Sequence, residues 1–408
     1  MSLLDQYEPF VARGTLDELR TVARQLEGRR IVTVNSTAVG GGVAEILNRL
    51  VPLSREMGID IRWDVIKGGD DFFGVTKRVH NALHGKPETF TARDYEILQE
   101  TTRRNLTDMD LDADVVFIHD PQPVGLIEAR RPAHGRWVWR CHIDVSAPQA
   151  DIWQFLADSV ARYDAAVFSA PQFARNLPIP QVMITPSIDP LSDKNRELSD
   201  SAIDTILERL RVPRDKPMIT QISRFDRLKD PVGVIAAFRM AHRYIDCRLV
   251  LAGGSAIDDP EGAEVLAAVH EAANGDPDIH VLELPPTANI EINAIQRASS
   301  LVLQKSLKEG FGLTVSEALW KGKPVIAGAV GGIPLQVTHR YSGILTHTVE
   351  GTAFWIKQLL NSPEYARRLG ENGREHVRTN FLLTRHLRDY LLLFLFLEHS
   401  EERVIGLA

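Results

Sequence analysis

Short apolar runs alternate with longer amphipathic stretches along most of the chain. In the first half, the strand candidates are residues 31–34, 59–66, 114–119, 136–141 and 165–168, with helical stretches between them. In the second half, the strand candidates are residues 218–222, 248–252, 280–284, 301–304, 324–327 and 343–345. Strands that alternate with helices predict a parallel α/β sheet, and two such series predict two sheets.

Length and segmentation together predict two domains. A chain of 408 residues is too long for one ordinary core and long enough for two. The proline-rich run at 176–190 is typical of a domain end followed by a linker. We therefore expect two Rossmann-like, doubly wound domains, residues 1–190 and 191–380, that face each other across a cleft. Residues 381–408 would form a helix that packs back on the first domain.

Composition narrows the class of protein. The chain is 44% hydrophobic and 25% charged, as in soluble globular enzymes, and its net charge of −7 offers no basic surface to nucleic acid. Cys141 and Cys247 lack disulfide-type or metal-binding spacing, which indicates core residues in a reducing cytosol. The acidic start lacks the pattern of a secretory signal, and the longest apolar run, 390–397, is too short to cross a bilayer. We therefore expect a cytoplasmic enzyme.

The most informative stretch is QKSLKEGFGLTVSEALWKGK, residues 304–323. It places Glu309 before the turn at 310–312 and Glu317 eight residues later, on an expected helix. Glycines in the turn let the backbone approach a ligand closely, and the start of a helix directs amide donors at an anion. Two carboxylates beside such a turn suit the hydroxyls and the charge of a nucleotide sugar. A plain strand–turn–helix corner with two solvated acids is the alternative.

A pair of cations follows the first strand of the second domain. Arg224 and Lys229 come just after the strand at 218–222, in the sequence SRFDRLKDP. A planar guanidinium and a mobile ammonium are complementary, so together they would neutralise a diphosphate from both sides. A solvated basic loop is the other interpretation.

A triple glycine at 40–42 separates the first strand from the helix that follows it. This order of elements is the geometry that binds phosphate at the start of a helix, and a purely structural turn is the alternative. The glycines do not form GxGxxG, and no acidic residue follows at the dinucleotide spacing. A nicotinamide cofactor is therefore disfavoured.

Polar side chains also end two apolar strands of the first domain. His119 and Asp120 follow one strand, and His142 and Asp144 follow the next. Open α/β sheets bind ligands at the carboxyl ends of their strands, which favours a site. Ordinary loop starts and a core histidine are the alternatives.

Together these motifs resemble the retaining GT-B glycosyltransferases of family 4. Arg224 and Lys229, followed by Glu309 and Glu317 as the family's E-x7-E pair, carry the resemblance in the second domain. The chain resembles the glycosyltransferring trehalose synthases more closely still. That resemblance rests on VNSTAVGGGVAEIL (34–47), HDPQP (119–123), WRCHIDVS (139–146), SIDPLSDKN (187–195), SRFDRLKDP (223–231) and EGFGLTVSEALWKGKPV (309–325).

The resemblance implies a reversible transfer of glucose from ADP-, UDP- or GDP-glucose to free glucose, giving α,α-trehalose. It gives catalytic roles to Arg224, Lys229, Glu309 and His142. It gives donor-binding roles to Gly41, Gly42, Gly310, Phe311, Gly312, Leu313 and Glu317. On the acceptor side it implies Asp120, with Asp144 and Asn35 as acceptor-side or structural residues. In this pattern the cations hold the diphosphate, Glu309 contacts the glucosyl hydroxyls and Glu317 binds the ribose.

The chemistry expected of these residues needs no metal and no cofactor. Fixed cations and amides would stabilise the charge that develops on the departing diphosphate. No carboxylate is clearly placed as a nucleophile, so the family's front-face attack with retention is the expected route. The expected partners are small molecules alone, namely the nucleotide sugar, glucose and trehalose, without nucleic acid or a membrane span. A homodimer is left open.

Other functions remain open at this point. A trehalose phosphorylase of the same fold would use phosphate in place of the nucleotide, although Glu317 as a ribose ligand argues for the nucleotide. A related retaining hexosyltransferase with another acceptor is a further alternative. A nucleotide-sugar sensor without turnover would need a lost catalytic group, whereas the motif positions are filled. A non-hydrolysing epimerase fits less well, because the cation pair and E-x7-E are not its hallmark.

Overall fold

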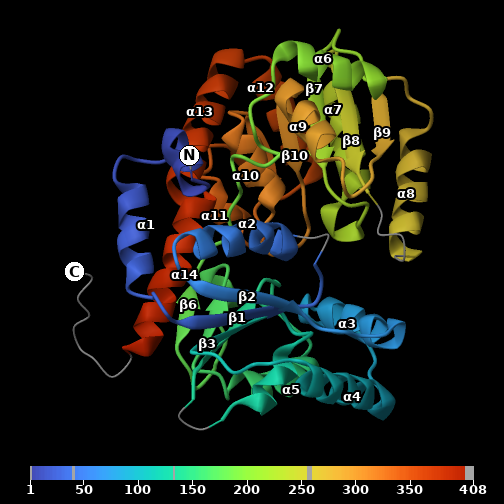
Figure 1. Cartoon of the computed structure of the whole chain (residues 1–408). Coiled ribbons are helices and arrows are strands. Elements are labelled where there is room, and N and C mark those ends of the chain that lie inside the picture. Colours follow the sequence, from blue (N-terminus) through green and yellow to red (C-terminus); the bar gives the residue numbers. More distant parts are fainter. Residues whose placement is uncertain (1, 39–41, 132–133, 255–259, 400–408) are drawn as a thin grey trace. The chain divides into compact units, whose positions relative to one another are not determined.

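The computed structural model describes residues 2–38, 42–131, 134–254 and 260–399. It divides into two compact units, Met1–Ser187 with Leu383–Ala408, and Ile188–Leu382 (Figure 1). Each unit is built around a parallel sheet of six strands. The predicted fold class of two Rossmann-like α/β domains is thereby confirmed.

The sheet of the first unit has the order β2-β1-β3-β4-β5-β6, and neighbouring strands are parallel throughout. Its strands are β1 (Arg30–Asn35), β2 (Asp60–Val65), β3 (Val115–His119), β4 (Arg136–Cys141), β5 (Ala165–Phe168) and β6 (Gln181–Met183). The central strands are apolar along almost their whole length because both faces are buried, which is typical of a parallel sheet covered by helices. The register pairs Val34 with Ile118, and His119 with Arg140. Strands β1, β3 and β4 therefore end at the same edge of the sheet.

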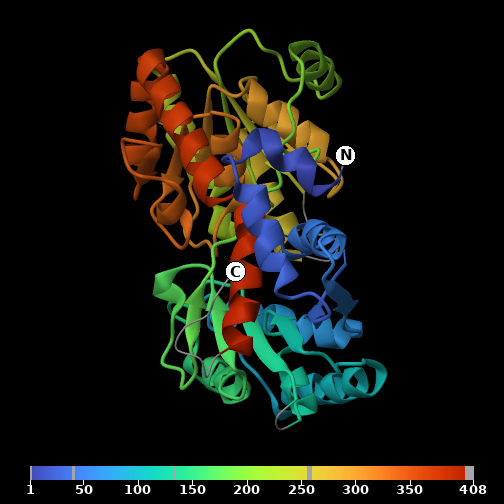
Figure 2. The same cartoon turned by 60° about the vertical axis from the view of Figure 1, so that its left-hand side comes forward.

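The helices of the first unit come from both ends of the sequence. They are α1 (Thr15–Arg24), α2 (Gly42–Glu56), α3 (Asp70–Leu83), α4 (Ala92–Asp108), α5 (Ala150–Val160) and α14 (Leu383–Glu398), with the 3-10 helices Leu4–Phe10, Val124–Ala129 and Pro171–Phe173. Helix α14, from the far end of the chain, lies beside α1 (Figures 1 and 2).

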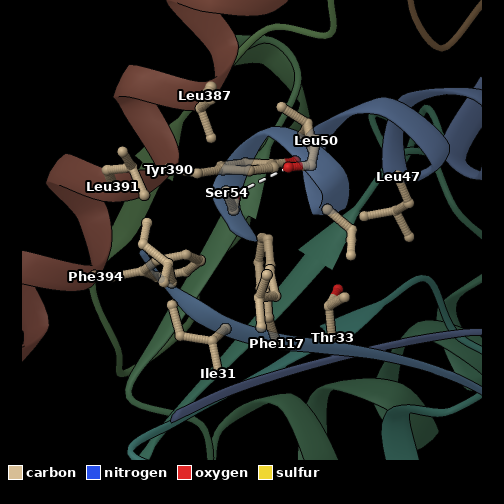
Figure 3. Close-up of a pocket in the computed structure, with 13 residues that line it drawn as sticks. Ile31, Thr33, Leu47, Leu50, Ser54, Phe117, Leu387, Tyr390, Leu391 and Phe394 are labelled. Atoms are coloured by element: carbon tan, nitrogen blue, oxygen red, sulfur yellow. Dashed lines mark hydrogen bonds between the residues drawn. The ribbon is translucent and has the colours of Figure 1, made fainter. Parts of the chain in front are cut away.

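Aromatic side chains join α14 to the sheet of the first unit. The ring of Phe117 on β3 lies 4.9 Å from the ring of Tyr390 and 5.5 Å from that of Phe394. Side chains of α14 and α2 converge here over β1 and β3, around an apolar cavity of about 20 Å³ (Figure 3). A cavity of this size holds at most about one water molecule. We therefore regard it as a packing defect in the core of the unit.

The sheet of the second unit has the order β12-β11-β10-β7-β8-β9. Its strands are β7 (Met218–Ile222), β8 (Arg248–Gly253), β9 (Ile279–Glu283), β10 (Leu301–Gln304), β11 (Val325–Gly328) and β12 (Ile344–Thr346). Its helices are α6 (Asp200–Arg209), α7 (Pro231–His242), α8 (Pro260–Ala273), α9 (Asn289–Ala298), α10 (Leu313–Trp320), α11 (Ile333–Gln336), α12 (Val349–Leu360) and α13 (Pro363–Asn380), with the 3-10 helix η4 (Arg227–Lys229). Apolar side chains point alternately to the two faces of the strands, as period-two geometry requires.

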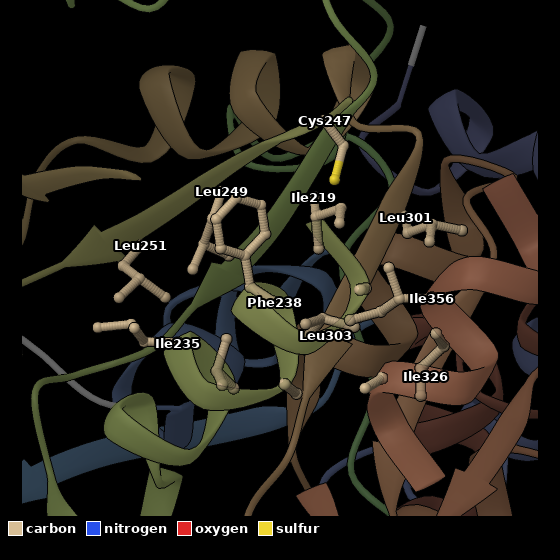
Figure 4. Close-up of a cluster of buried hydrophobic side chains, with 14 of the residues drawn as sticks. Ile219, Ile235, Phe238, Cys247, Leu249, Leu251, Leu301, Leu303, Ile326 and Ile356 are labelled. Atoms are coloured by element: carbon tan, nitrogen blue, oxygen red, sulfur yellow. The ribbon is translucent and has the colours of Figure 1, made fainter. Parts of the chain in front are cut away.

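Helices cover both faces of the second sheet. On one face, Ile219, Leu249 and Leu303 pack with Phe238 of α7 and Ile356 of α12 (Figure 4). On the other face, the strand side chains of Met218, Ile222, Val250 and Ala252 pack with Leu207 of α6 and Ile295 of α9. This two-sided burial explains why the strands are apolar runs rather than alternating ones.

The sequence does not predict one strand of the first sheet. The run at 176–190, expected to be a domain end followed by a linker, contains this edge strand, β6, and the boundary between the two units follows it at Ser187 and Ile188. Its prolines flank the strand, and β6 pairs on one side with β5, so a proline next to it disrupts no central ladder. Cys141 and Cys247 are buried and free, and no helix in the described part of the chain combines the length and apolarity that crossing a membrane requires.

Candidate active site

An ion pair joins two of the predicted catalytic residues in the second unit. The Nζ atom of Lys229 lies 2.6 Å from Oε2 of Glu309, although the two residues are 80 positions apart in the sequence. Lys229 ends the short helix η4 after β7, and Glu309 follows the neighbouring strand β10. Their side chains are 17% and 10% exposed, so water screens the pair only weakly. The parallel pairing of β7 with β10 is what brings the two strand ends together.

The Glu309 carboxylate is held by more than Lys229. The Ser306 hydroxyl donates to Oε2 at 3.1 Å, and the Gln304 amide approaches the same oxygen at 3.4 Å. Gln304 also donates to Ser306 at 3.0 Å, which closes a small network. All the contacts converge on Oε2, and Oε1 has no hydrogen-bonding partner among the described residues. The network therefore fixes the rotamer of Glu309 and leaves Oε1 for a ligand.

Glycines allow the backbone to fold tightly around Glu309. Gly312 has a φ of 83° where it precedes α10, a left-handed conformation that favours glycine. Gly331 has a φ of 53°, and a Cβ atom there would lie 1.6 Å from the carbonyl oxygen of Glu309. The loop after β11 can thus lie directly on the Glu309 backbone. Helix α10 begins at Leu313, so its amide donors and positive dipole end lie next to this turn.

A second buried ion pair supports the loop that carries Lys229. Asp230 has a φ of 49° and accepts a hydrogen bond from the Gly233 amide at 3.1 Å, which caps the start of α7. Its other carboxylate oxygen pairs with the ammonium of Lys305. The carbonyl oxygen of Lys229 also accepts from the side chain of Gln221 at 2.7 Å. These contacts tie the loop after β7 to β7 itself and to the chain just after β10.

The remaining predicted residues of the second unit are held differently. Arg224 is 55% exposed and lies 3.5 Å from the Asp226 carboxylate. Glu317 is buried within α10, with Lys194 at 3.8 Å from its carboxylate. The ammonium of Lys321 lies beside it and donates to the Glu317 carbonyl at 3.1 Å, and burial lowers the pKa of Lys321 to about 7. Arg224 is thus the more accessible of the two predicted cations, and Glu317 belongs to an inner charged cluster.

In the first unit, the two predicted histidines lie against each other. His119 ends β3 and His142 follows β4; their rings are stacked with centroids 5.4 Å apart, and His119 Nδ1 is 3.1 Å from His142 Nε2. On its other side, His119 Nε2 lies 2.9 Å from the hydroxyl of Thr33 on β1. Burial, with the nearby Arg140, lowers the pKa of His119 to about 3 and also lowers the pKa of His142. Both rings are therefore neutral near pH 7.

Asp120 lies at the same sheet edge in a left-handed conformation, with a φ of 67°. Its Oδ1 atom accepts a hydrogen bond from the His142 amide at 2.8 Å. Burial raises the pKa of Asp120 to about 6, and the amide of His142 and the charge of Arg140 oppose that rise. Arg140 is fully buried and donates to Ser169 at 3.2 Å. Asp120 therefore fixes the backbone from which His142 projects.

The other first-unit candidates take part in local turns. Asn35 is buried; its amide donates to the Thr37 carbonyl at 2.7 Å and its oxygen accepts from Trp63 at 2.9 Å. Asp144 is buried and accepts from the Ser146 amide at 2.9 Å. Gly42 is the first residue of α2, whereas Gly41 lies outside the described residues.

Sequence reasoning missed several residues of these two sites. Ser306, Gln304 and Lys305 adjoin Glu309 in sequence, but nothing in their spacing indicates a carboxylate clamp. Thr33 lies in the middle of an apolar run and reads as an ordinary strand residue. Its contact with His119 depends on the register of β1 with β3, which the sequence alone does not give.

One further cluster in the second unit has metal-ligand chemistry. His242, Asp246 and Asp278 place ligand atoms within 4.8 Å of one another. The ammonium of Lys216 lies 2.8 Å from Asp246 and 2.9 Å from Asp278. A lysine thus already supplies the positive charge, and the cluster sits near the amino ends of β8 and β9, at the opposite edge from Glu309.

Comparison with known proteins places the chain among glycosyltransferases. Residues 33–175 match the family model "Trehalose synthase, N-terminal domain", and residues 202–376 match "Glycosyl transferases group 1". A sucrose-phosphate synthase structure from Thermosynechococcus elongatus superposes with a TM-score of 0.72 at 20% identity, covering 91% of this chain and 100% of that one. The two doubly wound sheets and these matches define a glycosyltransferase with the GT-B fold.

Two curated relatives place the chain more narrowly. The trehalose synthase of Rubrobacter xylanophilus is 43% identical over 96% of this chain and 96% of its own length. A trehalose phosphorylase of Pleurotus pulmonarius is 28% identical over 92% of this chain, but the match covers 58% of that protein. The chain belongs to the trehalose synthase family and is a trehalose-related glycosyltransferase.

Proposed function

We propose that the protein is a retaining glucosyltransferase that makes α,α-trehalose from a nucleoside-diphosphate glucose and free glucose. The single observation that carries the proposal is the clamped Lys229–Glu309 pair beside the start of α10. A cation, a fixed carboxylate and the start of a helix in one place suit a ligand that carries both phosphate and sugar hydroxyls. Membership of the trehalose synthase family supports the choice of product.

In the second unit, we propose that the residues around Glu309 bind the nucleotide sugar. Arg224 and Lys229 neutralise the diphosphate, and Glu309 accepts hydrogen bonds from glucosyl hydroxyls through Oε1. Glu317 binds the ribose, and the amides of the 310–313 segment lie along the phosphates. When the nucleotide sugar binds, the Lys229 ammonium stays paired with Glu309 and donates its remaining hydrogen bonds to the diphosphate.

In the first unit, we propose that the sugars bind at the sheet edge that carries the two neutral imidazoles. His142 donates to a sugar oxygen, and Asp120, Asp144 and Asn35 bind the acceptor glucose directly or hold the backbone that binds it. Neutral imidazoles suit hydroxyl groups, because they do not require a charged group to lose its hydration.

The proposed reaction needs no metal and no covalent intermediate. The acceptor hydroxyl oxygen forms a bond to the anomeric carbon on the face from which the diphosphate leaves. The bond between that carbon and the diphosphate oxygen breaks, and the acceptor proton passes to the departing phosphate. The cations and amides stabilise the charge on the leaving oxygen, and the anomeric carbon gains oxocarbenium character. Attack on the same face retains the α configuration and yields an α,α linkage.

A donor panel tests this function. The purified chain is incubated with ADP-, UDP- or GDP-glucose and ¹³C-labelled free glucose, and products are identified by NMR. We expect labelled α,α-trehalose with at least one donor, and release of the matching nucleoside diphosphate. Products with a β linkage, or transfer only to acceptors other than glucose, would contradict the proposal.

A trehalose phosphorylase is the second candidate, because the chain is also similar to the Pleurotus enzyme. The two functions differ in what accepts glucose when trehalose is cleaved. The protein is therefore incubated with trehalose and either inorganic phosphate or a nucleoside diphosphate. We expect cleavage with the nucleoside diphosphate, and glucose 1-phosphate formed from phosphate would instead identify a phosphorylase.

A further inference from the structure

A chain of hydrogen bonds runs from the core of the first sheet to its ligand-binding edge. The Thr33 hydroxyl lies 2.9 Å from His119 Nε2, and His119 Nδ1 lies 3.1 Å from His142 Nε2. Thr33 and His119 are almost fully buried, whereas His142 is partly exposed. Its second ring nitrogen, Nδ1, has no hydrogen-bonding partner among the described residues. The chain thus ends on an atom that a ligand can contact.

The imidazoles of His119 and His142 are both neutral, so each ring carries one proton on either Nδ1 or Nε2. Burial lowers the pKa of His119 to about 3, and burial together with Arg140 lowers the pKa of His142. A neutral ring donates from one nitrogen and accepts at the other. The location of one proton in the chain therefore determines the location of all the others.

The Thr33 hydroxyl fixes the direction of the chain. Within the described part of the protein, His119 Nε2 is its one hydrogen-bonding partner. If His119 donated to Thr33, the hydroxyl proton would be buried without an acceptor, which is unfavourable. Thr33 therefore donates to His119 Nε2, and His119 donates from Nδ1 to His142 Nε2. The proton of His142 is then left on Nδ1.

We propose that Thr33, acting through His119, fixes His142 as a hydrogen-bond donor that faces an oxygen of the bound sugar. Thr33 and His119 are positioning residues, and His142 is the group that touches the ligand. The identity of the ligand rests on the proposed function, but the direction of the chain does not depend on it. The backbone bond from His142 to Asp120 keeps the ring in place while the tautomer is set from behind.

Nitrogen NMR of the ligand-free, ¹⁵N-histidine-labelled protein tests the tautomers directly. The ring nitrogen shifts distinguish protonated from unprotonated sites, and the His142→Gln spectrum assigns the His142 signals. We expect His119 and His142 each to carry the proton on Nδ1. A wild-type His142 protonated on Nε2 would overturn the proposal.

Variants of Thr33 test the origin of this order. Thr33→Val removes the hydroxyl at nearly constant shape, so we expect a second form in which both rings are protonated on Nε2. Thr33→Ser keeps the hydroxyl and should keep the wild-type spectrum. Thr220→Val, in which a buried strand threonine loses a 2.8 Å bond to Ser299, is the matched control and should change neither histidine. An unchanged His142 tautomer in Thr33→Val would sink the proposal.

Kinetics then connects the tautomer to the reaction. We expect Thr33→Val to lower kcat/KM for the nucleotide sugar about tenfold, which corresponds to about 1.4 kcal/mol, and Thr33→Ser to restore most of it. Failure of the wild-type protein to transfer glucose would contradict the proposed function and leave the NMR result standing. Wild-type kinetics in Thr33→Val, despite an altered tautomer, would instead show that the hydrogen bonds from Thr33 through His119 to His142 have no role in sugar binding.

Discussion

The two units place their site residues at equivalent edges of similar sheets but stabilise them by opposite means. In the second unit, the site is held by ion pairs, Lys229 with Glu309 and Lys305 with Asp230. In the first unit, the His119–His142 pair is neutral because burial lowers both pKa values. Burial also raises the pKa of Asp120 to about 6. The same architecture thus supports a site held by ion pairs in one unit and a site built around two neutral imidazoles in the other.

The difference matches the two kinds of group that a nucleotide sugar carries. A diphosphate needs fixed positive charge, and a cation whose partner already holds it loses less entropy when the ligand binds. Sugar hydroxyls need directional donors and acceptors rather than charge, and neutral imidazoles supply both. The comparison predicts that substitutions in the second unit act mainly on catalysis, whereas protonation in the first unit acts mainly on stability.

The largest expected effect comes from the charged site. Lys229→Ala should lower kcat/KM for trehalose synthesis about 1,000-fold, or about 4 kcal/mol, because it removes the cation proposed to stabilise the leaving diphosphate. Glu309→Ala should likewise remove most turnover. Initial rates with the preferred donor and free glucose measure both effects, with circular dichroism to verify the fold.

Lys216→Ala is the matched control for the lysine substitution. Lys216 also forms ion pairs in the second unit, with Asp246 and Asp278, but lies away from Glu309 in the structure. Its loss should leave kcat/KM close to the wild-type value. Near-normal rates in Lys229→Ala or Glu309→Ala would remove the charged site from the mechanism.

A smaller effect, on the free energy of unfolding, is expected when low pH protonates His119. The pKa of His119 is about 3 in the folded protein against about 6.5 in an unfolded chain, so the unfolded state binds more protons between these values. The stability that the neutral ring contributes is complete above pH 6.5 and is lost as pH falls towards 3. Wild type should therefore lose about 3 kcal/mol more than His119→Gln between pH 7 and pH 4.

Urea unfolding followed by tryptophan fluorescence measures this difference, since Trp139 lies in the strand next to His119. His134→Gln removes an exposed histidine of the same unit, with 58% of its side chain exposed, and serves as the control. It should follow the wild-type pH dependence. A His119→Gln variant that loses stability in parallel with wild type would show that this ring is not held neutral.

The sequence predicts the fully buried strands well and misses the short edge strand β6. The strands β4, β5, β7 and β10 fall where the apolar runs predict them, because both of their faces are buried. Strand β6 has only three residues, none of them fully buried, and prolines nearby obscure it. A short edge strand of this kind has little hydrophobic pattern of its own.

The candidate site divides in the same way. Lys229, Glu309, His119 and His142 could be predicted because strand-end polar residues and a recognisable motif mark them. The clamp from Ser306 and the contact from Thr33 could not, because each depends on a distance across the folded sheet. Which residues hold a functional side chain in place depends on tertiary geometry, so residue type alone says little about this role.

The smallest expected effect has the opposite sign to that of His119. The pKa of Asp120 is raised to about 6 from about 3.8, so the folded state binds more protons than the unfolded state between these values. Wild type should therefore gain about 2 kcal/mol relative to Asp120→Asn when pH falls from 7 to 4. Asparagine tolerates the left-handed backbone at this position and can still accept from the His142 amide, so the fold should persist.

Urea unfolding at both pH values measures the difference, with Asp17→Asn, an 83% exposed carboxylate, as the control. A constant stability difference between wild type and Asp120→Asn across this range would mean that Asp120 stays ionised down to pH 4 and that burial does not raise its pKa.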